Sequence, residues 1–96
     1  ETFGPVLPLM AFAGLDHCVE QVNATVYGLQ AGVFTDRLDV AKALHRRLDV
    51  GTVVVNEGPG FRIDSLPFGG MKQSGLGREG VIAAVEDFTE EKVLIF

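Results

Sequence analysis

Three glycines, at positions 75, 77 and 80, form the pattern G-x-G-x-x-G, which in some proteins holds the pyrophosphate of a dinucleotide. That fingerprint requires a strand before it, a helix after it and an acidic residue about 20 positions further on. Residues 71–74 instead belong to a glycine-rich loop, and no acidic residue stands at that distance. The pattern therefore predicts a loop that lets a helix begin beside another backbone segment.

The one cysteine and the two histidines are the other residues whose chemistry could support catalysis or metal binding. Cys18 is expected on the apolar face of a helix, near the acidic Asp16 and Glu20, whereas a reactive thiolate needs cationic neighbours. His17 adjoins Cys18, but adjacent helical residues do not face each other. His17 and His45 fall on separate predicted helices without a histidine four residues away. We therefore predict a structural cysteine, no catalytic residue and no metal site.

A long loop rich in glycine and proline carries large aromatic side chains. Phe61 and Phe68 could attach this loop to the core or line a pocket. Arg62 could bind an anionic group through its guanidinium, or it could pair with Asp64 or Glu57. A structureless loop this long in a compact domain is usually functional, or else disordered or a linker.

The spacing of apolar residues, and the glycine and proline residues that interrupt it, predict the helices and strands that would position this loop. A run of β-branched residues at 52–55 predicts a strand. Asp36 is expected to cap the helix 37–48, which lies between Asp36 and this strand. The alternating order predicts an α/β fold, a layered αβα segment with a largely parallel sheet. The expected strands are residues 6–12, 31–35, 52–55 and 92–96, the helices 15–25, 37–48 and 78–88, and the loop 56–77.

Composition narrows the class of protein. The 96 residues are 47% hydrophobic, which suits one globular domain and argues against disorder. The formal net charge of −5 argues against a nucleic-acid partner, which would require clustered Lys and Arg. No apolar run reaches the length of a membrane span, so no membrane partner is expected. A single cysteine fits a reducing compartment, and we expect a cytoplasmic protein.

Four motifs, taken in order, resemble one known family. They are E-T-F-G-P-V at residues 1–6, Y-G-L-Q-A-G-V-F-T at 27–35, G-T-V-V-V-N at 51–56 and P-F-G-G-M-K-Q-S-G-L-G-R-E-G at 67–80. Together they resemble the C-terminal part of the catalytic domain of NAD(P)-dependent aldehyde dehydrogenases, over the whole chain 1–96. The resemblance implies oxidation of an aldehyde to a carboxylic acid, with the catalytic cysteine, the water-activating glutamate and most of the NAD or NADP site upstream of this segment.

The resemblance also implies roles for individual residues. Glu1 matches the glutamate that hydrogen-bonds the nicotinamide ribose, and Phe3 matches the phenylalanine near the nicotinamide ring. Phe68 matches the phenylalanine beside the substrate tunnel, and Phe61 an aromatic at the tunnel mouth. Arg62 lies in an F-R-x-D loop similar to members acting on small hydroxy- or anionic aldehydes, such as lactaldehyde-type dehydrogenases.

Three interpretations remain open at this point. The chain is a fragment of an aldehyde dehydrogenase, which is inactive alone and whose parent is a homo-oligomer acting on an aldehyde. Alternatively, it is a stand-alone binding module, or an oligomerisation module, that retains the fold. Its first residue is not methionine and its last four are apolar, which favours the first interpretation.

Overall fold

The computed structural model describes residues 2–96. The predicted helices and the β-branched strand are present, each with bounds within three residues of those expected. The elements in chain order are α1 (Leu15–Asn23), β1 (Tyr27–Gly28), β2 (Gln30–Val33), α2 (Leu38–Arg47), β3 (Thr52–Val55), β4 (Met71–Lys72) and α3 (Val81–Asp87).

The strands form two separate pairs rather than one sheet. β2 and β3 pair in parallel, with Gln30 opposite Thr52 and Val33 opposite Val55. β1 and β4 pair antiparallel, with Tyr27 opposite Lys72. The predicted α/β class holds, but the prediction of a largely parallel sheet is correct only for β2 and β3. The short β4 was not foreseen, because two residues inside a glycine-rich loop show no alternation.

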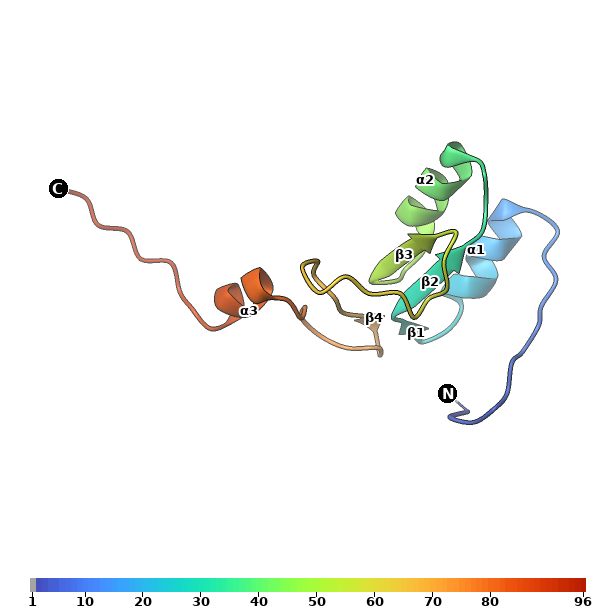
Figure 1. The fold of residues 1–96 in the computed structure, drawn as a ribbon, viewed down its shortest axis with the longest axis horizontal. Helices are drawn as coiled ribbons and strands as arrows, with labels where there is room; N and C mark the ends of the chain where they lie inside the picture. The colour runs from blue at the N-terminus through green and yellow to red at the C-terminus, as the bar shows by residue number, and fades with distance from the viewer. Residues whose placement is uncertain (1) are drawn as a thin grey trace.

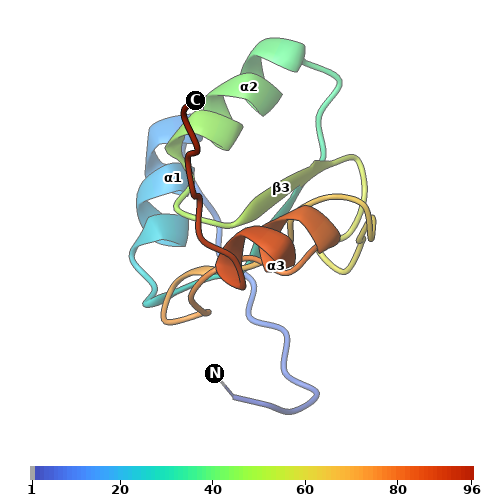
Figure 2. The same ribbon diagram turned by 90° about the vertical axis from the view of Figure 1, so that its left-hand side faces the viewer.

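The core lies between the first two helices and the parallel pair. Val19 of α1, Val33 of β2, and Leu44 and Leu48 at the end of α2 form one buried cluster. Figure 1 shows that α3 stands apart from α1 and α2 along the long axis. Figure 2 shows α1 and α2 on one side of β3. Among the described residues the helices therefore cover one side of the parallel pair, and the second helical layer of the predicted αβα arrangement is not formed.

The N-terminal end of α2 is capped differently from the expectation. Asp36 does not cap the helix, since the N-cap residue is Arg37 and no side chain caps it. The Arg37 N–H instead reaches back to Thr35 Oγ1 at 3.1 Å. The Arg37 guanidinium donates to Asp39, and this hydrogen bond holds the pKa of that exposed carboxyl below its usual value. The turn is thus ordered by threonine and an ion pair instead of an aspartate cap.

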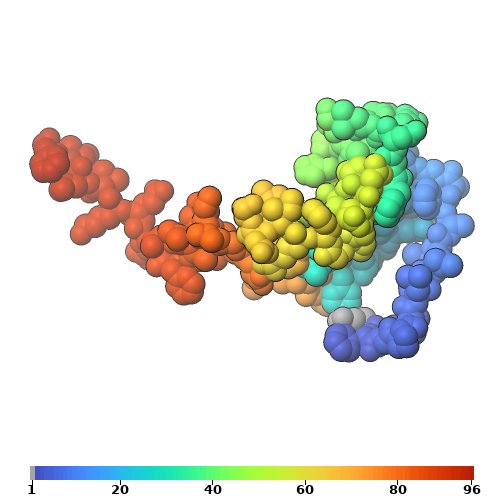
Figure 3. Space-filling view, viewed as in Figure 1, coloured from blue at the N-terminus to red at the C-terminus, as the bar shows by residue number. Residues whose placement is uncertain are grey.

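The two outer predicted strands, residues 6–12 and 92–96, are not strands in the structure. Both segments are extended and exposed. In Figure 3 the C-terminal segment projects away from the rest along the long axis, which gives the molecule its elongated outline. The radius of gyration is 16.8 Å, whereas a compact chain of this length has about 12–13 Å. Strand formation requires a neighbouring strand to satisfy the backbone, and no described segment lies beside either one.

We expect the isolated chain to associate, because these segments and α3 expose large apolar side chains. Phe88 and Ile95 are 90% and 86% exposed. Contiguous exposed apolar surface marks interaction sites, and the Debye length of about 8 Å at physiological salt weakens repulsion from the net charge. Sedimentation velocity at rising concentration should show dimers or larger species. A monomer at every concentration, with no binding of an apolar-surface dye, would contradict this expectation.

Candidate functional site

Arg62 is the centre of the candidate site. Its guanidinium carbon lies 4.5 Å from the centroid of the Phe68 ring, a cation–π arrangement. Its Nη2 lies 3.1 Å from Glu79 Oε2 and its Nε lies 3.5 Å from Asp64 Oδ1. The pairing with Asp64 that the sequence left open is therefore present. The ion pairs of Arg62 in the described residues do not include Glu57, whose carboxylate accepts the N–H of Gly58.

Glu79 is a residue of the site that sequence reasoning missed. It reaches Arg62 because residues 68 and 79 form an isolated antiparallel bridge. The Phe68 N–H donates to Glu79 O at 2.8 Å, and the Glu79 N–H donates to Phe68 O at 2.6 Å. This backbone pairing brings Glu79 close to Arg62, although the two residues are far apart in the sequence. The sequence signal for it was weak, namely a glutamate inside the glycine pattern at the start of the predicted helix 78–88.

The three residues predicted to contact substrate line one groove. Phe61, Arg62 and Phe68 face β3 across a shallow groove of about 260 Å³, whose floor is Thr52–Val55. The Phe61 carbonyl accepts a hydrogen bond from Gln30 Nε2 at 2.9 Å, which ties the loop to β2. Arginine, two aromatic rings and an aliphatic strand form a surface that suits a small molecule with a charged or polar end.

Asn56 positions the start of this loop. Its backbone is left-handed, with φ 59°, so the chain turns sharply where β3 ends. Its Oδ1 accepts the Thr35 N–H at 2.8 Å, and its own N–H donates to Val33 O at 2.7 Å. Asparagine tolerates this conformation better than most residues. Asn56 therefore ties the end of β3 to the end of β2.

The glycine pattern forms a tight backbone crossing. A Cβ built on Gly69 would lie 2.6 Å from the carbonyl oxygen of Gly77. Arg78 Nη1 donates to the carbonyls of Gly70 at 3.0 Å and Gly77 at 2.6 Å. The backbone is therefore closely packed where Gly69 crosses Gly77, whereas a Cβ built on Gly75 would meet no atom within 4 Å. A helix, α3, follows the pattern as expected, but the short strand β4 precedes it, contrary to the expectation.

The remaining candidates lie elsewhere. Glu1 is outside the described residues. Phe3 lies on the extended N-terminal segment with its side chain 93% exposed, so the structure does not bring it to the groove. Cys18 is a half-buried free cysteine on α1. The His17 ring is occupied by Ala13 N–H at Nδ1 and by the Gln21 amide at Nε2.

Within residues 2–96, no group of three or more His, Cys, Asp or Glu side chains could hold a metal ion. No helix in that range is long and apolar enough to cross a membrane.

Comparison with known proteins gives a consistent assignment. The aldehyde dehydrogenase family model matches residues 1–94. The chain is 48% identical over 95 residues to a sulfoacetaldehyde dehydrogenase of Neptuniibacter caesariensis and 45% identical to a lactaldehyde dehydrogenase of Methanococcus maripaludis. Each match covers 99% of this chain but only 21% and 20% of the relative.

A solved structure agrees with this assignment. Aldehyde dehydrogenase 21 of Physcomitrella patens, crystallised with the reaction product succinate, is 42% identical. It superposes with a TM-score of 0.83 over 88% of this chain and 18% of its own. The chain thus spans about a fifth of the length of these proteins. It belongs to the aldehyde dehydrogenase family.

Proposed function

We propose that the chain is the C-terminal part of the catalytic domain of an NAD(P)+-dependent aldehyde dehydrogenase whose substrate is a short aldehyde with an anionic or hydroxyl group. The observation that carries this proposal is Arg62, held over the Phe68 ring in the groove that Phe61 also lines. The relatives act on sulfoacetaldehyde and lactaldehyde, and one was crystallised with succinate, so their ligands bear the same kinds of group.

Arg62 has donor capacity left for a ligand. A guanidinium carries five N–H donors, and the two carboxylates lie near Nε and Nη2. No described residue has an assigned contact with Nη1. An anion that approaches this nitrogen would meet a charge-assisted donor, and the Phe68 ring would limit the directions in which the guanidinium can turn.

The two carboxylates compete with a ligand for Arg62. A ligand can bind only if its hydrogen bond to the guanidinium contributes more free energy than these ion pairs do. The Asp64 and Glu79 side chains are 98% and 69% exposed. Ion pairs this exposed contribute about 0–1 kcal/mol, whereas a hydrogen bond between a ligand and a charged group contributes about 1.5–3 kcal/mol. A substrate anion can therefore displace or share the guanidinium at small cost.

The cofactor would be bound mainly outside this segment. The close backbone crossing of Gly69 and Gly77, and the contact of Arg78 with the Gly70 carbonyl, support this proposal. When bound, NAD(P)+ supplies the hydride acceptor. In our proposal the carboxylate of Glu1 would accept hydrogen bonds from the nicotinamide ribose, and Phe3 would contact the ring. No chemical step is assigned to the described residues, which bind and orient the substrate.

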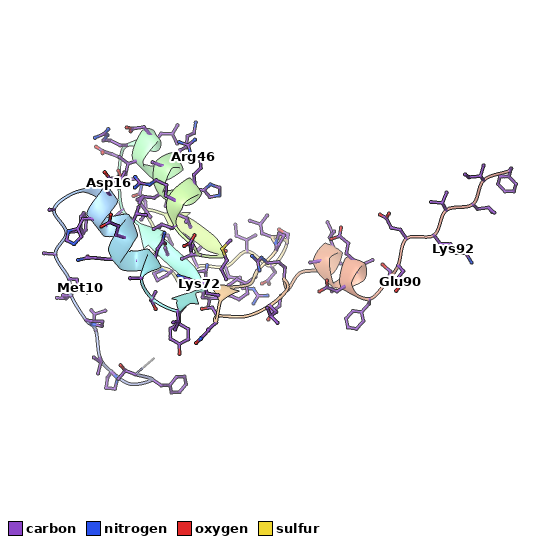
Figure 4. The ribbon with its side chains drawn as sticks, turned by 180° about the vertical axis from the view of Figure 1, so that it is seen from behind. Met10, Asp16, Arg46, Lys72, Glu90 and Lys92 are labelled. Atoms are coloured by element: carbon purple, nitrogen blue, oxygen red, sulfur yellow. The ribbon has the colours of Figure 1, made fainter. Side chains whose placement is uncertain are left out.

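Arg62→Ala in the full-length parent should lower kcat/KM for a carboxylate- or sulfonate-bearing aldehyde by about one to two decades. It should change kcat/KM for an uncharged aldehyde such as propanal by less than about threefold, because propanal makes no ionic contact. Steady-state kinetics on both substrates decide this. Arg46→Ala is the matched control, because Arg46 lies on α2 away from the groove (Figure 4). Equal losses on both aldehydes would mean that Arg62 is structural.

The competing proposal is a stand-alone binding or oligomerisation module that retains the fold. The exposed apolar side chains of α3 favour an interaction role of some kind, and they equally fit a homo-oligomeric, cytoplasmic parent in which they are covered. The intact mass of the natural protein, compared with its reading frame, separates the two. A natural polypeptide of the length of this chain would favour the module. A longer polypeptide that contains this chain would favour the dehydrogenase.

A further inference from the structure

The C-terminal end of α1 carries no basic side chain of its own in its last turn. The carbonyl groups at a helix C-terminus bear partial negative charge and favour a cation. Lys72 of β4 supplies one from far along the chain. Its Nζ donates to Thr25 O at 2.8 Å and lies 3.3 Å from Asn23 O. Lys72 lies beside this helix end in Figure 4.

Hydrogen bonds hold this helix end to the neighbouring helix α2. Asn23 Nδ2 donates to Arg47 O at 2.8 Å, and Asn23 Oδ1 accepts the Asp49 N–H at 2.9 Å. These bonds join the end of α1 to the end of α2. Both helices contribute to the buried cluster. The ammonium of Lys72 is therefore bound to a helix end that is hydrogen-bonded to α2 and adjoins the buried cluster.

The segment around Lys72 is held to β1 by a few additional contacts. The Gln73 N–H donates to Val26 O at 2.9 Å, and Ser74 Oγ accepts the Gly28 N–H at 2.8 Å. A Cβ built on Gly28 would lie 3.2 Å from Lys72 Cε, so this glycine gives the lysine stem room to pass. Because β4 has only two residues, the side-chain contacts of Lys72 form a large part of its attachment.

The backbone of Lys72 is left-handed, with φ 55°. A residue other than glycine keeps such a conformation only when its surroundings impose it. The two hydrogen bonds of its ammonium are the feature that distinguishes this lysine from an ordinary exposed one. Without them the turn at 72 would be free to relax and the segment before it would move.

That segment leads directly to the candidate site. Phe68 lies four residues before Lys72, and between them Arg78 Nη1 holds the Gly70 carbonyl at 3.0 Å. We propose that Lys72 is a positioning residue for substrate binding, which acts by anchoring β4 to the C-terminal end of α1 and so fixing Phe68, with Arg62 over its ring, against β3. The inference rests on the proposed function and assigns that function a residue outside the groove.

The test uses the full-length parent with Lys72→Met, which keeps the stem and removes the charge, and Lys72→Arg, which keeps a cation. Lys42→Met on α2 is the matched control. With succinic semialdehyde and with propanal, Lys72→Met should raise KM about tenfold with kcat changed less than twofold, because ground-state binding is lost. Lys72→Arg should restore KM to within about threefold of wild type, and Lys42→Met should leave it unchanged.

Amide hydrogen exchange provides a readout that does not depend on activity. The Gln73 and Gly28 amides should exchange about tenfold faster in Lys72→Met. A lower melting temperature with unchanged KM and exchange would overturn the inference. If Lys72→Met does not fold, Lys72→Gln replaces it under the same criteria. Absence of aldehyde oxidation by the wild-type parent would instead refute the proposed function, and the exchange result alone would then decide whether Lys72 anchors β4.

Discussion

The isolated 96-residue chain is expected to form no NADH or NADPH from any aldehyde. Its one cysteine is half-buried on α1 and does not line the groove. Loss of the nucleophile alone lowers kcat by about a millionfold in a well-studied hydrolase, and in our proposal the cofactor is bound mainly outside this segment. The purified chain would be assayed at 340 nm with NAD+ and NADP+ against a panel of aldehydes.

The control is the full-length parent, purified and assayed in the same way. Its activity shows that the substrates and conditions are suitable. Reduced cofactor that forms in proportion to the purified chain, and that follows it through successive columns, would contradict the expectation. That outcome would mean that residues 1–96 contain a complete catalytic site.

Gly51→Ala should destabilise the full-length parent by at least about 3 kcal/mol. Gly51 lies just before β3, and its N–H donates to the carbonyls of Gly28 at 3.1 Å and Leu29 at 3.0 Å. A Cβ at this position would lie only 1.6 Å from the carbonyl oxygen of Gly69 and 2.8 Å from its carbon. Both atoms are backbone atoms, so the glycine loop would have to move away from β3.

The matched control is Gly58→Ala, because a Cβ at position 58 meets no atom within 4 Å. Such a substitution is neutral or stabilises by about 0.4–1 kcal/mol through the unfolded state. Soluble yield and the melting temperature, measured side by side, should separate the two variants clearly. Equal melting temperatures would show that the loop does not cross Gly51 as closely in the parent.

The local elements of this protein could be predicted from its sequence. The stripe of Leu38, Ala41, Leu44 and Leu48 predicts α2, because every third or fourth residue of a helix faces the same side. The last three are buried, whereas Leu38 is 67% exposed. The β-branched run identified β3. The order of four motifs indicated the family. The resemblance to that family predicted Phe61, Arg62 and Phe68 as substrate-binding residues.

Pairings between distant segments were decided only by the tertiary structure. The isolated antiparallel bridge, and not any local pattern, gives Arg62 its second carboxylate, Glu79. Lys72 reaches the end of α1 because β4 pairs with β1. The apolar runs at 6–12 and 92–96 have the composition of strands, yet neither is one here. A helix satisfies its backbone within its own segment, whereas a strand or a long-range ion pair exists only where the fold brings a partner to it.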